Sequence, residues 1–230
     1  MNEKTKALKA AFPHTIPIFT GFIFMGAAYG ILMDSKGYGV GWTFLMSALA
    51  YGGSGQYVAI TFLTSIFNPV QAFLMTLMVN ARHIFYGISM LDKYKDAGKL
   101  KPFLIFSMCD ETFSLVYSTE APEGVDKYWF MFFISLLNYL YWIMGSVLGG
   151  ILGSMVEFNT KGLDFVLTAL FVVIFLSHWS AEKNRKPALI GVLSSVVCLL
   201  IFGPEGFIIP AMITILVVLT VSRRKLVEGE

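Results

Sequence analysis

Four ionisable side chains lie inside long apolar stretches of this sequence. Arg82 and His83 are adjacent in one stretch, and Asp110 and Glu111 are adjacent in the next. An ionised group at the centre of a bilayer costs at least about 2.5–3.5 kcal/mol, so such residues pair with one another or take part in moving a solute or an ion. Two interpretations follow: a structural ion pair between Arg82 and one carboxylate, or a site that handles a charged solute.

The carboxyl groups are the preferred candidates for carrying a coupling proton. Asp110 and Glu111 lie near the middle of their apolar stretch, and burial disfavours the charged form of a carboxyl group. His83 is the third candidate, because imidazole changes its charge near neutral pH. The alternative for His83 is a satisfied core residue. Arg82 lies closer to the end of its stretch, so it could instead extend its guanidinium to the membrane surface.

A glycine-rich break interrupts the apolar stretch 42–67. Its sequence is Tyr51-Gly52-Gly53-Ser54-Gly55-Gln56, and each glycine inside a helix costs about 1 kcal/mol relative to alanine. Breaks at membrane depth are tolerated where the freed backbone groups line a cavity or are buried in protein. Such backbone can hold both charged ends of an amino acid, as half-helix ends do in transporters. The alternative is a close helix–helix contact that needs small residues.

Further polar side chains complete the predicted binding site. Arg82 and Tyr86 are four residues apart and share one face of a helix, whereas Asn80 and His83 share another. Arg82 is suited to grip a carboxylate through two parallel hydrogen bonds. The predicted substrate-binding residues are Gly53, Ser54, Gly55, Gln56, Asn80, Arg82, Tyr86 and Asn138, and the predicted proton-coupling residues are Asp110, Glu111 and His83.

The elements that position these residues are predicted to be membrane-spanning helices. Hydrophobic residues make up 56% of the chain and charged residues 14%, and the mean hydropathy is +0.70; a soluble domain carries roughly 25% charged residues. The length supplies about seven or eight apolar segments of ~20 residues each. We therefore expect an all-α, polytopic membrane helix bundle that crosses the cell membrane several times, with residues 1–230 forming a single transmembrane domain.

The basic residues predict which loops face the cytoplasm. Lysine and arginine gather at the N-terminus and in the segments 93–101, 183–186 and 223–225. Such segments mark cytoplasmic loops. Both termini are therefore expected in the cytoplasm, and the basic N-terminal segment is interpreted as a retained tail, because it lacks the apolar core and cleavage site of a signal peptide.

This orientation constrains how the apolar stretches cross the membrane. The four basic segments reach one side if the stretch 42–67 is a re-entrant hairpin broken near 51–56. For the segments 93–101 and 183–186 to lie on the same side, one of the stretches between them must also enter and leave on one side. A hairpin in the 29-residue stretch 128–156, bent near 138–150, would do this. The alternative is a full crossing at each of these stretches and a weakly obeyed charge rule.

Several function classes find no support in the sequence. A net charge of +2 is too small to suggest a nucleic-acid partner. Cys109 and Cys198 form no CxxC pair, so neither a disulfide framework nor a zinc site is predicted. HExxH, GxSxG and P-loop motifs are absent from the sequence, and we expect no enzyme, metal or cofactor.

A set of short motifs follows the same order as in a known family. The motifs are Gly26 and Gly30 at four-residue spacing, Met46-Ser47, Gly53-Ser54-Gly55-Gln56, Asn80-Ala81-Arg82-His83 with Tyr86, Asp110-Glu111-Thr112, and Gly203-Pro204. In these motifs the chain resembles the AzlC family of branched-chain amino acid permeases, and the resemblance covers nearly the whole length. The chain has Tyr51-Gly52 before the break, where Phe-Ala is common in the family.

The resemblance implies a specific biological role. The family is described as the large subunit of a bacterial inner-membrane exporter that acts with a small AzlD-type membrane subunit. Its substrates are leucine-like amino acids and, in some members, methionine. The leading interpretation is therefore a subunit that exports branched-chain amino acids, coupled to protons or another ion. Two alternatives stay open: an intramembrane enzyme acting on a lipid through Asp110, Glu111 and His83, and an assembly subunit that transports nothing.

Overall fold

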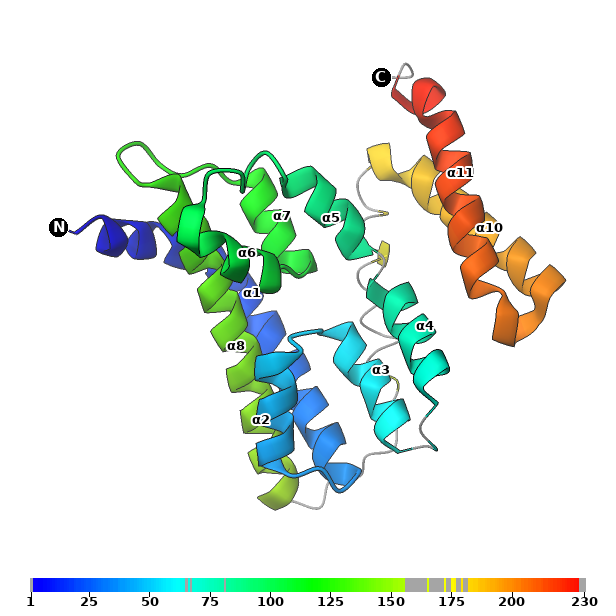
Figure 1. Cartoon of the computed structure of the whole chain (residues 1–230), viewed down its shortest axis with the longest axis horizontal. Helices are drawn as coiled ribbons and strands as arrows, with labels where there is room; N and C mark the ends of the chain where they lie inside the picture. Colours follow the sequence, from blue (N-terminus) through cyan, green and yellow to red (C-terminus); the bar gives the residue numbers. More distant parts are fainter. Residues whose placement is uncertain are drawn as a thin grey trace. The chain divides into compact units, whose positions relative to one another are not determined.

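The computed structural model describes residues 2–64, 66, 68–80, 82–155 and 182–227, together with Phe165, Val172, Phe175, Leu176 and Trp179. Every regular element in this part of the chain is a helix, which confirms the prediction of an all-α membrane bundle (Figure 1). Most of the apolar stretch 163–179 lies outside the described residues. The helices are α1 (Glu3–Ser35), α2 (Val40–Leu49), α3 (Ser54–Leu63), α4 (Pro69–Asn80), α5 (Arg82–Met90), α6 (Lys101–Phe106), α7 (Asp110–Ser118), α8 (Lys127–Met155), α10 (Glu182–Gly206) and α11 (Ile208–Val227), with a short 3₁₀ turn at Gly98–Leu100.

The contacts divide the chain into two compact units, Met1–Val166 and Leu167–Glu230. Among the described residues, three helical segments are long and apolar enough to cross a membrane: Glu3–Ser35 and Lys127–Met155 in the first unit and Arg185–Gly203 in the second. The second unit pairs α10 with α11 across a turn at Gly203, whose φ of +71° favours glycine. A single transmembrane domain over the whole chain stays a prediction.

Two long parallel helices, α1 and α8, pack together at the centre of the first unit. Lys4 near the start of α1 lies over the Trp129 ring near the start of α8, and Asp34 at the far end of α1 reaches Gly153 of α8. Between these ends, glycines of one helix face glycines of the other. A Cβ on Gly26 would lie 2.8 Å from the Ser146 backbone nitrogen. Small residues therefore let the two backbones touch, as in other membrane helix pairs.

The first hairpin, α2 and α3, confirms the predicted break near 51–56. The chain leaves helical geometry at 50–53, and α3 starts again at Ser54. The two open ends of the hairpin lie together, because the Tyr38 hydroxyl before α2 donates to the Leu63 carbonyl oxygen at the end of α3, at 2.7 Å. Figure 1 shows the helices running in opposite directions beside α1 and α8. The hairpin thus begins and ends at the level where α1 ends.

A second hairpin exists, but the predicted location was wrong. The stretch 128–156 was expected to bend near 138–150, and instead α8 is one continuous helix from Lys127 to Met155. Its glycines serve the contact with α1, so they do not break it. The break lies in the preceding stretch, where α6 ends at Phe106 and α7 begins at Asp110.

The α6–α7 hairpin opens toward the opposite end of the unit from α2–α3. Lys93, in the loop that precedes α6, donates to the Tyr117 carbonyl oxygen near the end of α7, at 3.1 Å. The same loop packs in a buried apolar cluster with the first part of α1 and the start of α8. The two hairpins therefore enter from opposite ends and meet near the middle (Figure 1). Each is followed by a further helix, α4 or α8, a repeated order typical of transporters.

Candidate functional site

Two short helices, α3 and α7, begin close together at the centre of the first unit, next to Arg82 of α5. Arg82, the first residue of α5, forms an ion pair with Asp110, the first residue of α7, with Nη1 and Oδ2 2.7 Å apart. Its Nη2 donates to the hydroxyl of Ser54, the first residue of α3, at 2.9 Å. An ion pair between Arg82 and one of the two carboxylates, one of the two interpretations of the sequence, is therefore present. Helix N-termini carry partial positive charge, so this point favours an anion.

The ion pair is partly accessible, and one of its atoms is unsatisfied. The Arg82 and Asp110 side chains keep 31% and 23% of their exposure. The second carboxylate oxygen of Asp110, Oδ1, is buried without a hydrogen-bond partner in the described part of the chain. A buried acceptor without a partner is costly, and a bound cationic group would satisfy it. Tyr86 lies beside this carboxylate, with its ring stacked on Phe113.

Asn80 and His83 surround the ion pair from the α4–α5 junction. Asn80 lies against Gly55, where an added Cβ would be 3.4 Å from the amide nitrogen of Asn80. His83 Nδ1 lies 3.2 Å from the Asn80 carbonyl oxygen, and its ring meets the Tyr86 ring edge to face. The predicted residues of 53–55 and 80–86 are thus brought together around Arg82.

Gln56 faces away from this cluster. Its Oε1 accepts a hydrogen bond from the Trp142 indole at 2.7 Å, and its Nε2 donates to the Ser47 hydroxyl at 3.2 Å. Gln56 is 1% exposed, so these contacts fix α3 against α8 and α2. Asn138 is likewise buried, and it donates to the Thr112 hydroxyl of α7 at 3.1 Å. These two predicted site residues hold the hairpins onto α8 in the structure.

The tips of the two hairpins touch through residues that the sequence reasoning did not select. The Tyr51 hydroxyl lies 3.7 Å from the Cys109 sulfur, and the Tyr51 ring packs on Phe106 and Tyr139. Tyr51 has a φ of +42°, which makes it the one non-glycine residue with positive φ in the described segments. Such strain persists at functional sites. A bulky aromatic directly before two glycines was the available signal.

Glu111 adjoins the same tip. It follows Asp110 at the start of α7 and lies near Cys109, within electrostatic range of Arg82. Since Arg82 pairs with Asp110, Glu111 is the second carboxyl group of the site. Within the described residues, no group of three His, Cys, Asp or Glu side chains is placed to hold a metal ion.

Comparisons with known proteins agree with these features. Residues 17–156 match the family model described as AzlC protein. The chain is 55% identical, over its full length and 92% of the relative, to the branched-chain amino acid transport protein AzlC of Bacillus subtilis. An uncharacterized membrane protein of Haemophilus influenzae is 44% identical over 98% of this chain and 93% of its own.

A more distant relative is the inner membrane protein YgaZ of Escherichia coli, 24% identical over 79% of this chain and 78% of the relative. No solved structure matches. The matched region 17–156 contains both hairpins, the Arg82–Asp110 pair and most of α1 and α8. The chain therefore belongs to the AzlC family.

Proposed function

We propose that this chain is the transport subunit of a membrane exporter for branched-chain amino acids. The observation that carries the proposal is the Arg82–Asp110 pair beside the N-termini of two half-helices, α3 and α7. A transport protein for branched-chain amino acids is 55% identical over the full chain. Re-entrant half-helices that meet near mid-depth are the usual construction of substrate sites in secondary transporters.

The binding mode follows from the charges at the site. The substrate carboxylate binds Arg82 beside the N-terminus of α3, because the guanidinium and the positive end of the helix both favour an anion. The substrate ammonium group binds Asp110 Oδ1, the buried acceptor that has no partner among the described residues. When the substrate binds, the Arg82–Asp110 pair is replaced by two ion pairs, one between Arg82 and the substrate carboxylate and one between Asp110 and the substrate ammonium group. The bound substrate thereby links α3, α5 and α7.

The orientation of the first unit follows from its lysines. The N-terminal tail, the loop 91–101 and the start of α8 lie at one end, held by the apolar cluster of Ala11, Tyr94, Ala97 and Phe130. This end carries the lysines of the tail and of that loop, whereas the opposite end carries Lys36. Lysine-rich ends face the cytoplasm. We therefore propose that the N-terminus lies in the cytoplasm, and that the C-terminus lies there too because of its own basic residues.

The proposed complex includes a small AzlD-like membrane subunit, as the family resemblance implies. The direct test is exchange of labelled leucine, valine and methionine in proteoliposomes that contain this chain alone or with that subunit. We expect counterflow of leucine and valine above that of empty vesicles when both are present. Absence of exchange for every amino acid, with a correctly folded complex, would overturn the proposal.

Glu111 is the proposed proton carrier, because Arg82 already neutralises Asp110. Glu111→Gln is expected to keep leucine counterflow, which needs no driving ion, and to lower efflux driven by a pH gradient by at least about tenfold. The matched comparison is Asp110→Asn, which removes the partner of Arg82 and should reduce both assays. The assignment fails if Glu111→Gln retains full proton-driven efflux.

His83 provides the control for this assignment. An imidazole can take up and release a proton, and His83 lies beside Asn80 and Tyr86. His83→Gln keeps a polar side chain of similar reach. If His83→Gln loses proton-driven efflux and Glu111→Gln keeps it, the proton carrier is His83 and not Glu111.

A further inference from the structure

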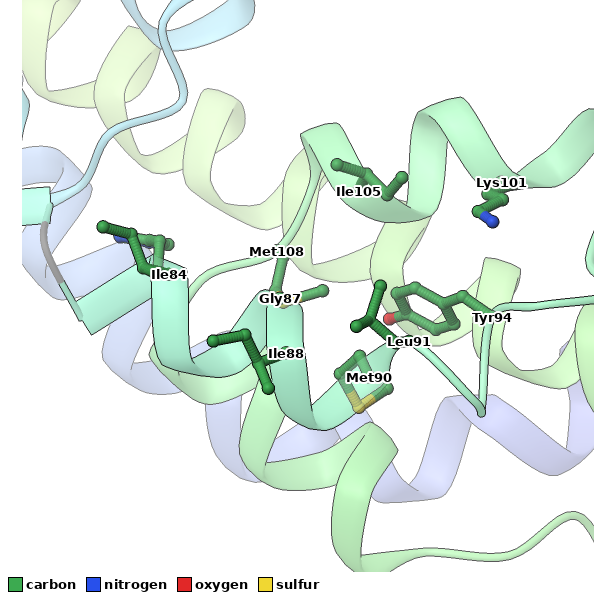
Figure 2. Close-up of a pocket in the computed structure, with 10 residues that line it drawn as sticks. Ile84, Gly87, Ile88, Met90, Leu91, Tyr94, Lys101, Ile105 and Met108 are labelled. Carbon is green, nitrogen blue, oxygen red and sulfur yellow. The ribbon is translucent and has the colours of Figure 1, made fainter. Parts of the chain in front are cut away.

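An apolar cavity of about 400 Å³, open on one side, lies between α5 and α6 (Figure 2). Its lining residues Ile84, Ile88, Leu91 and Ile105 are each more than half exposed. Isoleucine, leucine and methionine side chains make up most of its walls. Figure 2 shows Ile84 and Ile88 of α5 on one side and Ile105 of α6 on the other, with Gly87 between the two isoleucines. Because Gly87 has no side chain, the cavity is widest on its α5 side at this residue.

The two ends of the cavity have different surroundings. One end is lined by His83 and Met108, which lie one residue from Arg82 and two residues from Asp110. The other end is lined by Tyr94 and Lys101, which belong to the lysine-rich end of the unit. Neither Arg82 nor Asp110 lines the cavity itself, which extends along α5 from His83 toward the proposed cytoplasmic surface.

We propose that this cavity receives the aliphatic side chain of the amino acid bound at Arg82 and Asp110, and that Gly87 sets its width. The inference rests on the proposed function. A branched aliphatic chain needs an apolar pocket next to polar groups that hold its carboxylate and ammonium ends. The cavity supplies such a pocket along α5, starting at His83, the residue that follows Arg82, and it leads to the side from which an exporter takes its substrate.

Gly87 offers a substitution that fills the cavity without disturbing the fold. A Cβ on Gly87 would meet nothing within 4 Å, and Gly87 lies inside α5 with ordinary helical backbone. A leucine there gains helix propensity and narrows the pocket. Gly41 is the matched control, because it also lies in a helix, α2, and also has nothing within 4 Å of an added Cβ.

The test is selectivity in the counterflow assay, with labelled leucine and valine as probes. Gly87→Leu is expected to lower the leucine-to-valine ratio at least about tenfold, because one misplaced methylene in an apolar pocket changes discrimination by 10- to 200-fold. Gly41→Leu should keep the wild-type ratio. Ile105→Ala widens the opposite wall and should raise the ratio. An unchanged ratio in both cavity variants overturns the proposal.

Labelling distinguishes a substrate cavity from a groove filled by lipid. Ile88→Cys is prepared with Cys109→Ser and Cys198→Ser and treated from the cytoplasmic side with a water-soluble, membrane-impermeant thiol reagent. We expect labelling that leucine slows at least about threefold. If the cysteine reacts only with a lipid-soluble reagent, the cavity faces lipid and the proposal is overturned. If the wild-type chain exchanges no amino acid, the proposed function itself fails. If the wild-type chain exchanges leucine normally and the cavity variants show the same selectivity as the wild type, only the cavity assignment fails.

Discussion

Replacing Arg82 by alanine is expected to lower leucine counterflow at least about thirtyfold. Arg82 holds Asp110 at 2.7 Å and Ser54 at 2.9 Å, and in the proposed mechanism it also binds the substrate carboxylate. Truncating one partner of a hydrogen-bonded charge pair costs about 2–5 kcal/mol, and each 1.4 kcal/mol is tenfold in affinity. The measurement is exchange of labelled leucine in proteoliposomes at matched protein content.

Two variants separate a loss of substrate binding from a loss of folding. Arg82→Lys keeps the positive charge beside Asp110 but loses the fork that reaches two acceptors, so we expect near-normal thermal stability and a loss of exchange of about tenfold or more. Lys36→Ala removes an exposed cation at the other end of the unit and should leave exchange unchanged.

Exchanging the charges tests whether the pair is only structural. Arg82→Asp combined with Asp110→Arg restores an ion pair across the same two helices. If the pair merely locks α5 to α7, this double variant should regain transport that either single change removes. In the proposed mechanism it stays inactive, because the anion-binding group then lies on the wrong helix. Full recovery of leucine exchange would contradict the substrate role of Arg82.

Gly30→Ala is expected to destabilise the protein by at least about 3 kcal/mol. A Cβ at Gly30 would overlap the Ser146 carbonyl oxygen and the Gly150 nitrogen, and backbone atoms of packed helices cannot move aside as a flexible side chain can. Overpacking of a well-filled contact usually costs 1–3 kcal/mol, and occasionally more. For a chain of this size, we expect the midpoint of thermal unfolding in detergent to fall by roughly 6–12 °C.

Gly21→Ala is the control on the same helix. A Cβ at Gly21 would meet nothing within 4 Å, and alanine is the better helix former, so stability should be equal to or slightly above that of the wild type. Equal unfolding midpoints for Gly30→Ala and Gly21→Ala would show that α1 and α8 do not pack backbone to backbone.

The sequence predicted those parts of the site whose residues are energetically unfavourable in an apolar helix. Charges in apolar stretches and glycines in a helix are both expensive, and Arg82, Asp110 and the 51–56 break were found in that way. Gln56 and Asn138 were grouped with them because they are polar. Polarity alone does not distinguish a side chain that faces a substrate from one that bonds another helix, as Gln56 does with Trp142.

The second hairpin was misplaced because both the 29-residue length and the glycine series of stretch 128–156 were interpreted as signs of a bend. Stretch 128–156 holds four glycines, yet in α8 they form a smooth face against α1. Stretch 102–118 holds no glycine but is 17 residues long, shorter than the ~20 that one crossing needs. That shortage was the available signal for the break between α6 and α7. Cys109, in extended conformation before α7, makes this break without glycine.

The meeting of two hairpin tips has an electrical consequence. Each hairpin is shorter than α1 or α8, and the tips of the two hairpins meet at the contact of Tyr51 with Phe106 and Cys109. In the proposed mechanism this contact separates the two sides of the membrane. Voltage falls most steeply across the thinnest insulator, and a full crossing is worth about 2.3 kcal/mol per elementary charge per 100 mV. In the proposed mechanism, a proton that passes these tips crosses a large part of the membrane voltage within a short displacement. Turnover should then depend on voltage although the amino acid itself carries no net charge.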